Sequence, residues 1–212
     1  MHGLGQTSSC WQSTLTYLPK QSAAICPNLF ELCTSPDISY QKLYKAFVAY
    51  CDKFTQPLNF CGVSLGAILA LNYAIDYPQK VHSLVLIAPQ FKMPRYLMKL
   101  QNIIFNILPE KMFLKSGVLK NNMIQLSKTM LNLDFSGRLE RIVCPVLVVC
   151  GAKDYVNQKA AKTLTNRLTT ANYYIIKNAG HEVNIEAPKS LALAIEQFYE
   201  NINALQFEDS RK

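Results

Sequence analysis

Residues 58–76 read LNFCGVSLGAILALNYAID, and they give the clearest indication of the fold. Its beginning, 58–64, is a short apolar run typical of a buried strand, and the remainder has the composition of a helix. The pentapeptide GVSLG at 62–66 lies at the junction, with Ser64 at its centre. Small residues two before and two after a serine let the chain turn sharply and lift the hydroxyl out of a sheet. The pattern therefore predicts a nucleophile between a strand and a helix N-terminus, where negative charge is favoured.

Three further apolar runs bounded by turn residues predict strands at 81–89, 144–151 and 172–180. Because all of these runs are apolar on both faces, they suit a parallel sheet that helices cover on both sides. Apolar residues at helical spacing in 43–54 and 191–198 predict two of those helices. The alternation indicates an α/β fold with a mostly parallel sheet flanked by helices.

The segment 91–133 interrupts this alternation, because its sequence predicts two or three helices and no strand. We predict a helical cap inserted into a core that consists of 1–90 and 134–212. Five of the six methionines fall in the segment, and flexible thioethers suit adaptable apolar surfaces. Four side chains are therefore candidates for a substrate pocket beneath the cap: Met93, Leu97, Met123 and Met130. The alternative is that these side chains pack the cap onto the core.

Charge is concentrated in the same segment. The chain has a formal net charge of +8, and 91–133 contains seven Lys and Arg residues against a single Glu. A basic amphipathic lid is able to contact an anionic lipid surface or an acidic substrate, and a solvated face is the alternative interpretation. Nucleic acid is excluded as a partner because the sequence contains no arginine-rich run and no zinc-finger spacing. Apolar runs stay below the roughly 18 residues that span a bilayer, so we predict no transmembrane segment.

The seven cysteines are scattered, with no C-x-x-C pair, and several lie in apolar runs. This usage predicts reduced thiols and a cytoplasmic location, and no signal-peptide pattern is present at the N-terminus. The sequence contains no metal-ligand cluster, phosphate-binding glycine loop or dinucleotide fingerprint. We therefore expect no metal and no other cofactor. The natural substrate and the oligomeric state are left open.

A nucleophilic serine needs a base to take its proton, and the chain offers three histidines. His181 directly follows the last predicted strand and precedes a helix, which places it where catalytic groups collect in an open α/β sheet. His82 lies near the start of a strand and His2 in the opening turn. We predict that His181 is the base.

The candidate acid is Asp154, three residues after Gly151 at the end of a predicted strand. An N-cap of the helix that begins near Val156 would also explain an aspartate at this position. The order of Ser64, Asp154 and His181 along the chain is that of one particular fold, and it favours Asp154 as the catalytic acid. Two other aspartates, Asp76 and Asp134, are predicted to be structural.

The chain opens with MHGLGQ at 1–6, a glycine-rich turn. A tetrahedral intermediate carries an oxyanion that needs two backbone N–H donors. One donor is expected from Leu65, directly after the nucleophile, and the other from a glycine-rich turn. We predict that Leu4 supplies the second N–H.

Four motifs in this order resemble the α/β-hydrolase superfamily, in particular a small capped serine esterase or lipase: HGLGQTSSCW at 2–11, CGVSLGA at 61–67, PVLVVCGAKD at 145–154 and NAGHEVNIEAP at 178–188. The resemblance implies a serine hydrolase that cleaves small to medium apolar carboxylic esters through an acyl-enzyme intermediate. Thioesterases and peptidases use the same scaffold and triad, so they are the nearest alternative. A weakly catalytic or non-catalytic relative that binds a hydrophobic ligand is the alternative from a different class.

The sequence departs from the family pattern at its start. Family members usually carry two or three strands before the opening turn, and the last of them lies between a strand near 23–26 and the strand that bears the serine. Here nothing precedes Met1. Either the neighbouring strands close up, another chain fills the space, or the protein starts upstream of Met1, and we favour the last explanation. A turn tethered on one side only would leave activity weak or absent, since losing one oxyanion donor costs about a hundredfold or more.

Overall fold

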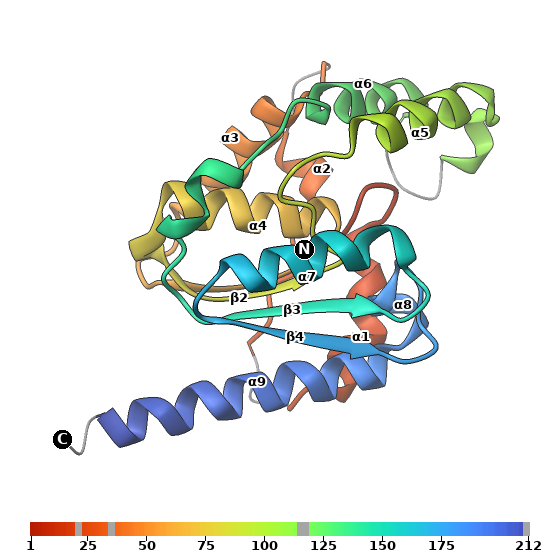
Figure 1. The fold of residues 1–212 in the computed structure, drawn as a ribbon. Coiled ribbons are helices and arrows are strands. Elements are labelled where there is room, and N and C mark those ends of the chain that lie inside the picture. Colours follow the sequence, from red (N-terminus) through yellow and green to blue (C-terminus); the bar gives the residue numbers. More distant parts are fainter. Residues whose placement is uncertain (20–22, 34–36, 114–118, 210–212) are drawn as a thin grey trace.

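The computed structural model describes residues 1–19, 23–33, 37–113 and 119–209. Within them, four parallel strands form one sheet in the order β1 (Leu58–Val63), β2 (Val81–Ile87), β3 (Val146–Gly151) and β4 (Ala171–Ile176), shown in Figure 1. The prediction of a parallel sheet flanked by helices is confirmed. All four predicted runs contain strands, although β4 is shorter than its apolar run because the chain turns after Ile176.

Helices cover both faces of the sheet. One face packs against α4 (Leu65–Asp76) and α7 (Tyr155–Arg167), and the other packs against α1 (Gln12–Tyr17) and α9 (Pro188–Asp209), as Figure 1 shows. Successive strand residues point to opposite faces, so the inner strands alternate between two cores. On β2, for example, Leu84 joins the α4 side and Val85 the α9 side, and both are completely buried.

Additional elements surround this body. Helix α3 (Tyr40–Cys51) packs on α4 and α2 (Leu29–Leu32) on α3, while α8 (Val183–Glu186) leads into α9. Short 3-10 helices complete the described elements: Ser8–Trp11, Pro78–Lys80, Glu110–Met112 and Ser136–Arg141.

The segment 91–133, called the insertion below, contains α5 (Arg95–Ile107) and α6 (Lys120–Met130). Both helices lie above α4, on the side away from the sheet (Figure 1). The chain enters and leaves the insertion at one place, because Met93 N donates to Leu133 O at 3.0 Å and Phe135 N donates to Phe91 O at 2.8 Å. An antiparallel bridge pairs Lys92 with Asp134 between these bonds.

Met1 pairs with the free edge of β1. Its ammonium nitrogen donates to Cys61 O at 2.6 Å, and Val63 N donates to Met1 O at 3.2 Å. Burial lowers the pKa of this ammonium group. The expected strand at 23–26 is wrong: residues 23–28 are irregular. The physical reason is that these residues and β1 line the same cavity of about 620 Å³, which keeps their backbone away from the edge of β1.

All seven cysteines are free thiols, and Cys51, Cys144 and Cys150 are buried. None of the helices in the described part of the chain combines the length and the apolar character needed to cross a bilayer.

Candidate active site

Ser64 occupies a strained turn between β1 and α4. Its φ and ψ angles are 52° and −111°, a left-handed conformation that costs a non-glycine residue on the order of 1–3 kcal/mol. Two backbone hydrogen bonds hold the turn: Ser64 N donates to Ile87 O at 2.9 Å, and Ile68 N donates to Ser64 O at 3.0 Å. The serine is therefore fixed at the carboxyl end of β1 and at the N-terminus of α4.

The two flanking glycines are required by close backbone contacts. A Cβ atom at Gly62 would collide with the backbone of Gly66 and lie 2.7 Å from Ala67 N. A Cβ atom at Gly66 would lie 2.6 Å from Met1 O. The small residues predicted around Ser64 thus let α4 approach both its own strand and the opening turn.

Asp154 and His181 meet at the same edge of the sheet, after β3 and β4. Asp154 Oδ2 accepts a hydrogen bond of 2.8 Å from His181 Nδ1. The Asp154 side chain is 6% exposed and that of His181 is 44% exposed. Burial opposes ionisation of Asp154, but hydrogen bonds from His181 and Asn157 outweigh it, so the pKa of this carboxyl group is lowered.

Asp154 also caps α7, because its Oδ1 accepts a hydrogen bond from Asn157 N at 3.3 Å. The two interpretations of this residue from sequence are therefore compatible. The carboxylate uses one oxygen for the helix N-terminus and the other for the imidazole, and the helix fixes the direction in which the carboxylate points.

The loop that carries His181 is held from within the chain. The Glu186 carboxylate accepts from Gly180 N at 2.7 Å and from Glu182 N at 3.0 Å, so it binds the backbone on both sides of the histidine. Asn178, which lies just before this loop, has a φ of 64° and therefore a left-handed backbone conformation.

The opening turn lies beside the serine. A Cβ atom at Gly3 would lie 3.5 Å from Ser64 Cβ, which places the backbone of this turn against Ser64. Leu4 packs its side chain beside Phe113 and Met123 of the insertion. Leu65 is the first residue of α4, where a backbone N–H has no carbonyl partner within the helix. These two leucines are thus positioned near Ser64, and their role as oxyanion donors stays a prediction.

His2 stabilises the opening turn. Its Nδ1 lies 2.9 Å from Gly3 O, and its Nε2 accepts a hydrogen bond from Leu29 N at 2.9 Å. Only a neutral ring can donate at one nitrogen and accept at the other. Burial lowers the pKa of His2, which favours the same neutral form.

Sequence reasoning missed Asn157 and Gln90. Asn157 Nδ2 donates to both Asp154 oxygens, at 2.8 and 2.9 Å, and Gln90 Nε2 donates to Asn157 Oδ1 at 2.6 Å. An asparagine three residues after the acid, in the first turn of the next helix, was a readable signal. The sequence around Gln90 gives no comparable signal, because its hydrogen bond to Asn157 depends on how the end of β2 and the start of α7 are arranged in space.

Gln6 is a third residue that the sequence did not single out. Its Oε1 accepts from Gly3 N at 3.0 Å, and its Nε2 donates to Glu182 Oε1 at 2.8 Å. One buried side chain therefore ties the opening turn to the residue next to His181, although the two segments lie at opposite ends of the sequence.

Other predicted site residues have different surroundings. Met93 and Met130 are buried in the main core, and Met123 reaches to 3.3 Å from a Cβ atom placed at Gly5. The side chain of Leu97 lies outside the described residues. In the described part of the chain, no hydrogen bond joins the Ser64 hydroxyl to His181, and no three His, Cys, Asp or Glu side chains gather as a metal-binding group.

The comparison with protein families decides the assignment. A family model described as "Alpha/beta hydrolase family" matches residues 1–194. The chain belongs to this family. It is 21% identical over 229 residues to the protein named "Putative carbamate hydrolase RutD" from Escherichia coli O81, covering 89% of this chain and 85% of that protein. It is 20% identical to the monoacylglycerol lipase ABHD6 of Rattus norvegicus, covering 96% of this chain and 75% of that protein.

Solved structures share the fold. NosK from Streptomyces actuosus superposes with a TM-score of 0.78 at 19% identity, covering 95% of this chain and 96% of that chain. The α/β-hydrolase chain described here is accordingly a hydrolase by family, and its reaction and substrate are matters for proposal.

Proposed function

We propose that this α/β hydrolase is a serine hydrolase that cleaves small to medium apolar carboxylic esters through an acyl-enzyme intermediate. The observation that carries the proposal is the 2.8 Å hydrogen bond between His181 Nδ1 and Asp154, formed at the sheet edge where the strained Ser64 turn also ends. A strained serine, a paired histidine and a buried carboxylate are the parts that activate a hydroxyl nucleophile.

The first half of the reaction forms the acyl-enzyme. Ser64 Oγ attacks the ester carbonyl carbon while His181 Nε2 takes the hydroxyl proton. Asp154 holds Nδ1–H, so it selects the tautomer whose Nε2 is basic and stabilises the imidazolium that forms. The Leu4 and Leu65 N–H groups bind the oxyanion, and its collapse breaks the ester C–O bond while His181 protonates the departing alcohol.

The second half releases the acid. A water molecule gives its proton to His181 and attacks the acyl carbon, and the second tetrahedral intermediate expels Ser64, which regains its proton. The contact between the nucleophile and the base commonly tightens only when substrate binds. The Asp154–His181 pair is already formed, so proton transfer from Ser64 requires only that His181 approach Ser64.

Covalent labelling with a fluorophosphonate probe tests the nucleophile. We expect wild-type protein to be labelled and Ser64→Ala to be unlabelled, with His181→Ala strongly slowed because the serine then lacks its base. A matched control is Ser136→Ala, which replaces a half-buried serine outside the site. Equal labelling of wild type and Ser64→Ala would overturn the proposal.

A substrate panel separates the alternatives. p-Nitrophenyl esters of increasing acyl length, acyl-CoA, aminoacyl anilides, a carbamate and a monoacylglycerol would be compared, the last two because relatives are named for them. Fastest turnover of short and medium esters supports the proposal, and a preference for thioester or anilide would replace it. Turnover that His181→Ala abolishes excludes a purely ligand-binding relative. We propose a cytoplasmic location on the strength of the seven free thiols.

A further inference from the structure

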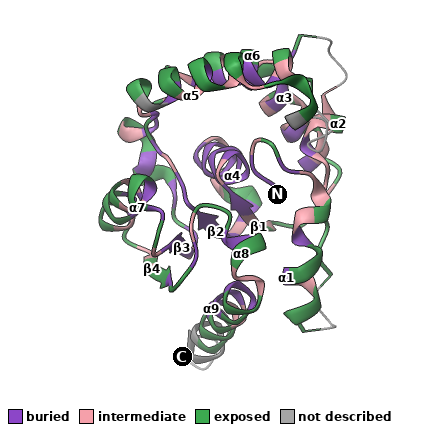
Figure 2. Cartoon of the chain, turned by 90° about the vertical axis from the view of Figure 1, so that its right-hand side faces the viewer, coloured by how far each residue is buried: buried purple, intermediate pink, exposed green. Residues whose placement is uncertain are grey.

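The outward side of α5 is apolar, which is unusual for a helix at the surface of a soluble domain. Tyr96 and Ile107, near its two ends, are 80% and 78% exposed. Between them the side chains of Leu100, Ile103 and Ile104 are also exposed. Figure 2 shows the exposed colour along α5 at the edge of the molecule farthest from α9.

These five side chains form one stripe. Successive residues of a helix are about 100° apart, so positions 96, 100, 103, 104 and 107 fall within one face. Met98 and Asn102 are buried and lie on the opposite face, which packs toward α6 and the body. We call the exposed face the α5 stripe, defined as Tyr96, Leu100, Ile103, Ile104 and Ile107. A contiguous apolar patch of this kind marks an interaction surface more often than scattered single residues do.

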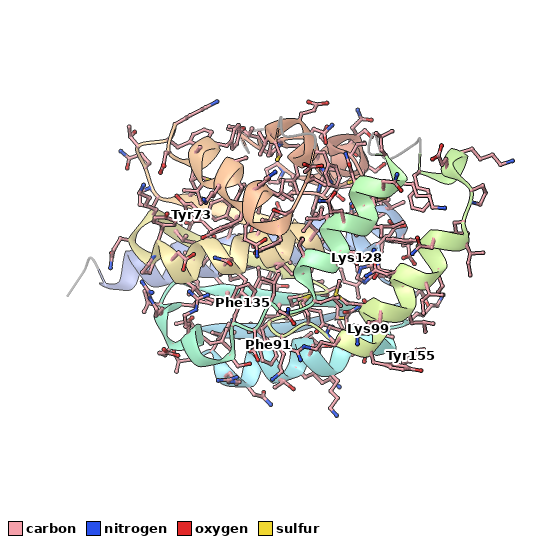
Figure 3. All side chains as sticks on the ribbon, turned by 90° about the horizontal axis from the view of Figure 1, so that it is seen from above. Tyr73, Phe91, Lys99, Lys128, Phe135 and Tyr155 are labelled. Atoms are coloured by element: carbon pink, nitrogen blue, oxygen red, sulfur yellow. The ribbon has the colours of Figure 1, made fainter. Side chains whose placement is uncertain are left out.

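The charges next to the stripe are positive. Arg95 and Lys99 are exposed on the same helix, and α5 itself contains no acidic residue. Lys111 is exposed shortly after its end, beside Glu110. In the view from above, Lys99 on α5 and Lys128 on α6 lie on the side of the molecule that faces away from the sheet (Figure 3).

An apolar stripe bordered by cationic side chains matches the interface of an anionic bilayer. Apolar side chains enter the boundary between headgroups and acyl chains, and each adjacent Lys or Arg adds attraction to anionic headgroups. A neutral protein partner would cover the stripe but would make no use of the positive border. We propose that the α5 stripe docks this protein reversibly on membranes that contain anionic lipid.

The position of α5 connects the stripe to the opening turn. Phe105 on the inner side of α5 packs edge-on against Phe113 with ring centroids 5.5 Å apart, and Phe113 packs with Leu4 and Met123. A membrane bound at the stripe would therefore lie on the same part of the molecule as the segment that covers the turn beside Ser64. The docking itself does not depend on the proposed esterase activity.

Vesicle co-sedimentation tests the inference. The full chain carrying Ser64→Ala would be mixed with vesicles of phosphatidylcholine alone or with about a third phosphatidylglycerol. We expect clear binding to the anionic vesicles only, weakened by salt. The double variant Ile103→Asp, Ile107→Asp should lose at least tenfold in partitioning. The double variant Arg95→Gln, Lys99→Gln should lose roughly fivefold per residue, the equivalent of about 1 kcal/mol each.

The matched control is Leu193→Asp on α9, an apolar residue that is also exposed but lies on the other side of the sheet. It should bind vesicles as the parent does. The α5 variants should have the same thermal unfolding temperature as the parent. When the same α5 substitutions are made in the protein that retains Ser64, hydrolysis of a water-soluble ester should also be unchanged, which shows that the variants fold.

Three results would overturn the inference. They are equal binding to both vesicle types, unchanged binding of the Ile103→Asp, Ile107→Asp variant, and a dimer in size-exclusion chromatography that this variant dissociates. The last would assign the stripe to a second copy of the chain. Because binding is measured without turnover, failure here leaves the proposed esterase activity standing, and failure of fluorophosphonate labelling leaves the docking standing.

Discussion

Helices α4 and α5 have nearly the same length and a similar supply of leucine and isoleucine, yet they have opposite surroundings. Every residue of α4 from Leu65 to Ile75 is buried, because the sheet, α3 and the 3-10 helix Ser136–Arg141 pack around the helix. On α5 the large apolar side chains of one whole face are exposed. The burial of a helix is therefore determined by its position relative to the sheet and not by its composition alone.

Polar contacts also differ between the Asp154 site and the insertion. At the site, both oxygens of Asp154 have hydrogen-bond donors. In the insertion, Asn102 Oδ1 on α5 and Ser127 Oγ on α6 are buried without a partner. Such groups cost about 1–3 kcal/mol each when buried. The site is thus fixed by matched polar contacts, whereas the insertion depends mainly on apolar packing.

The largest expected effect lies at the site. Asp154→Asn should reduce kcat for a water-soluble ester by about 10⁴-fold, because an amide neither stabilises the imidazolium nor selects the correct tautomer. Steady-state kinetics measures this. Ile104→Asn on α5, which introduces the same amide side chain at an exposed position, should leave kcat within about twofold. Similar losses in both variants would remove the distinction between the regions.

Stability offers the next contrast. Leu69→Ala on α4 should lower the free energy of unfolding by about 3 kcal/mol, since Leu69 is fully buried and its loss leaves a cavity. Ile103→Ala on α5 should change it by less than about 0.5 kcal/mol. Urea unfolding followed by circular dichroism measures both. A large effect of Ile103→Ala would mean that α5 is packed as tightly as α4.

A smaller effect is expected from Asn157→Ala. Without its two bonds to Asp154 the acid is less well positioned, and kcat should fall by about tenfold to a hundredfold with little change in KM. The pKa of Asp154 should rise, because a donor that lowers it is removed, so the NMR titration profile of the Asp154 carboxyl group should move to higher pH. Val156→Ala, at the exposed neighbouring position, is the control. An unchanged profile would show that Asn157 serves only the helix.

The smallest effect concerns His2. Its pKa is lowered in the folded chain, so the unfolded chain binds more protons once the pH falls below about 6.5. The stability that the neutral ring contributes is therefore present above that pH and is lost as the pH falls, by at most about 1.4 kcal/mol per pH unit. Urea unfolding at several pH values should show this difference between wild type and His2→Asn. Parallel curves would contradict it.

Much of the body could be predicted from sequence, because strand residues buried on both faces form short, uniformly apolar runs. The spacing of Gly62, Ser64 and Gly66 also predicts a sharp turn between a strand and a helix. His181 was found from its position directly after the last predicted strand and Asp154 from the order of the three residues along the chain, and the structure brings the two together. The prediction of a strand near 23–26 was wrong because an apolar stretch forms a strand only where it reaches a neighbouring edge, and a cavity separates this stretch from the edge of β1.

Other features could not be predicted, for two physical reasons. The bridges made by Gln6 and Gln90 join segments distant in sequence, and a single glutamine carries no periodic signal. The α5 stripe has a regular helical spacing, but spacing shows only that apolar residues share a face. It does not show whether that face looks toward the core or away from it.

The bridge between Lys92 and Asp134 has a consequence for engineering. Because the insertion enters and leaves the body at two paired residues, segments of other lengths could be grafted there without moving the ends of β2 or β3. Chimeras joined at this pair would exchange α5 and α6 while the sheet, Ser64 and the Asp154–His181 pair stay the same, so the insertion and the body could evolve as separate modules.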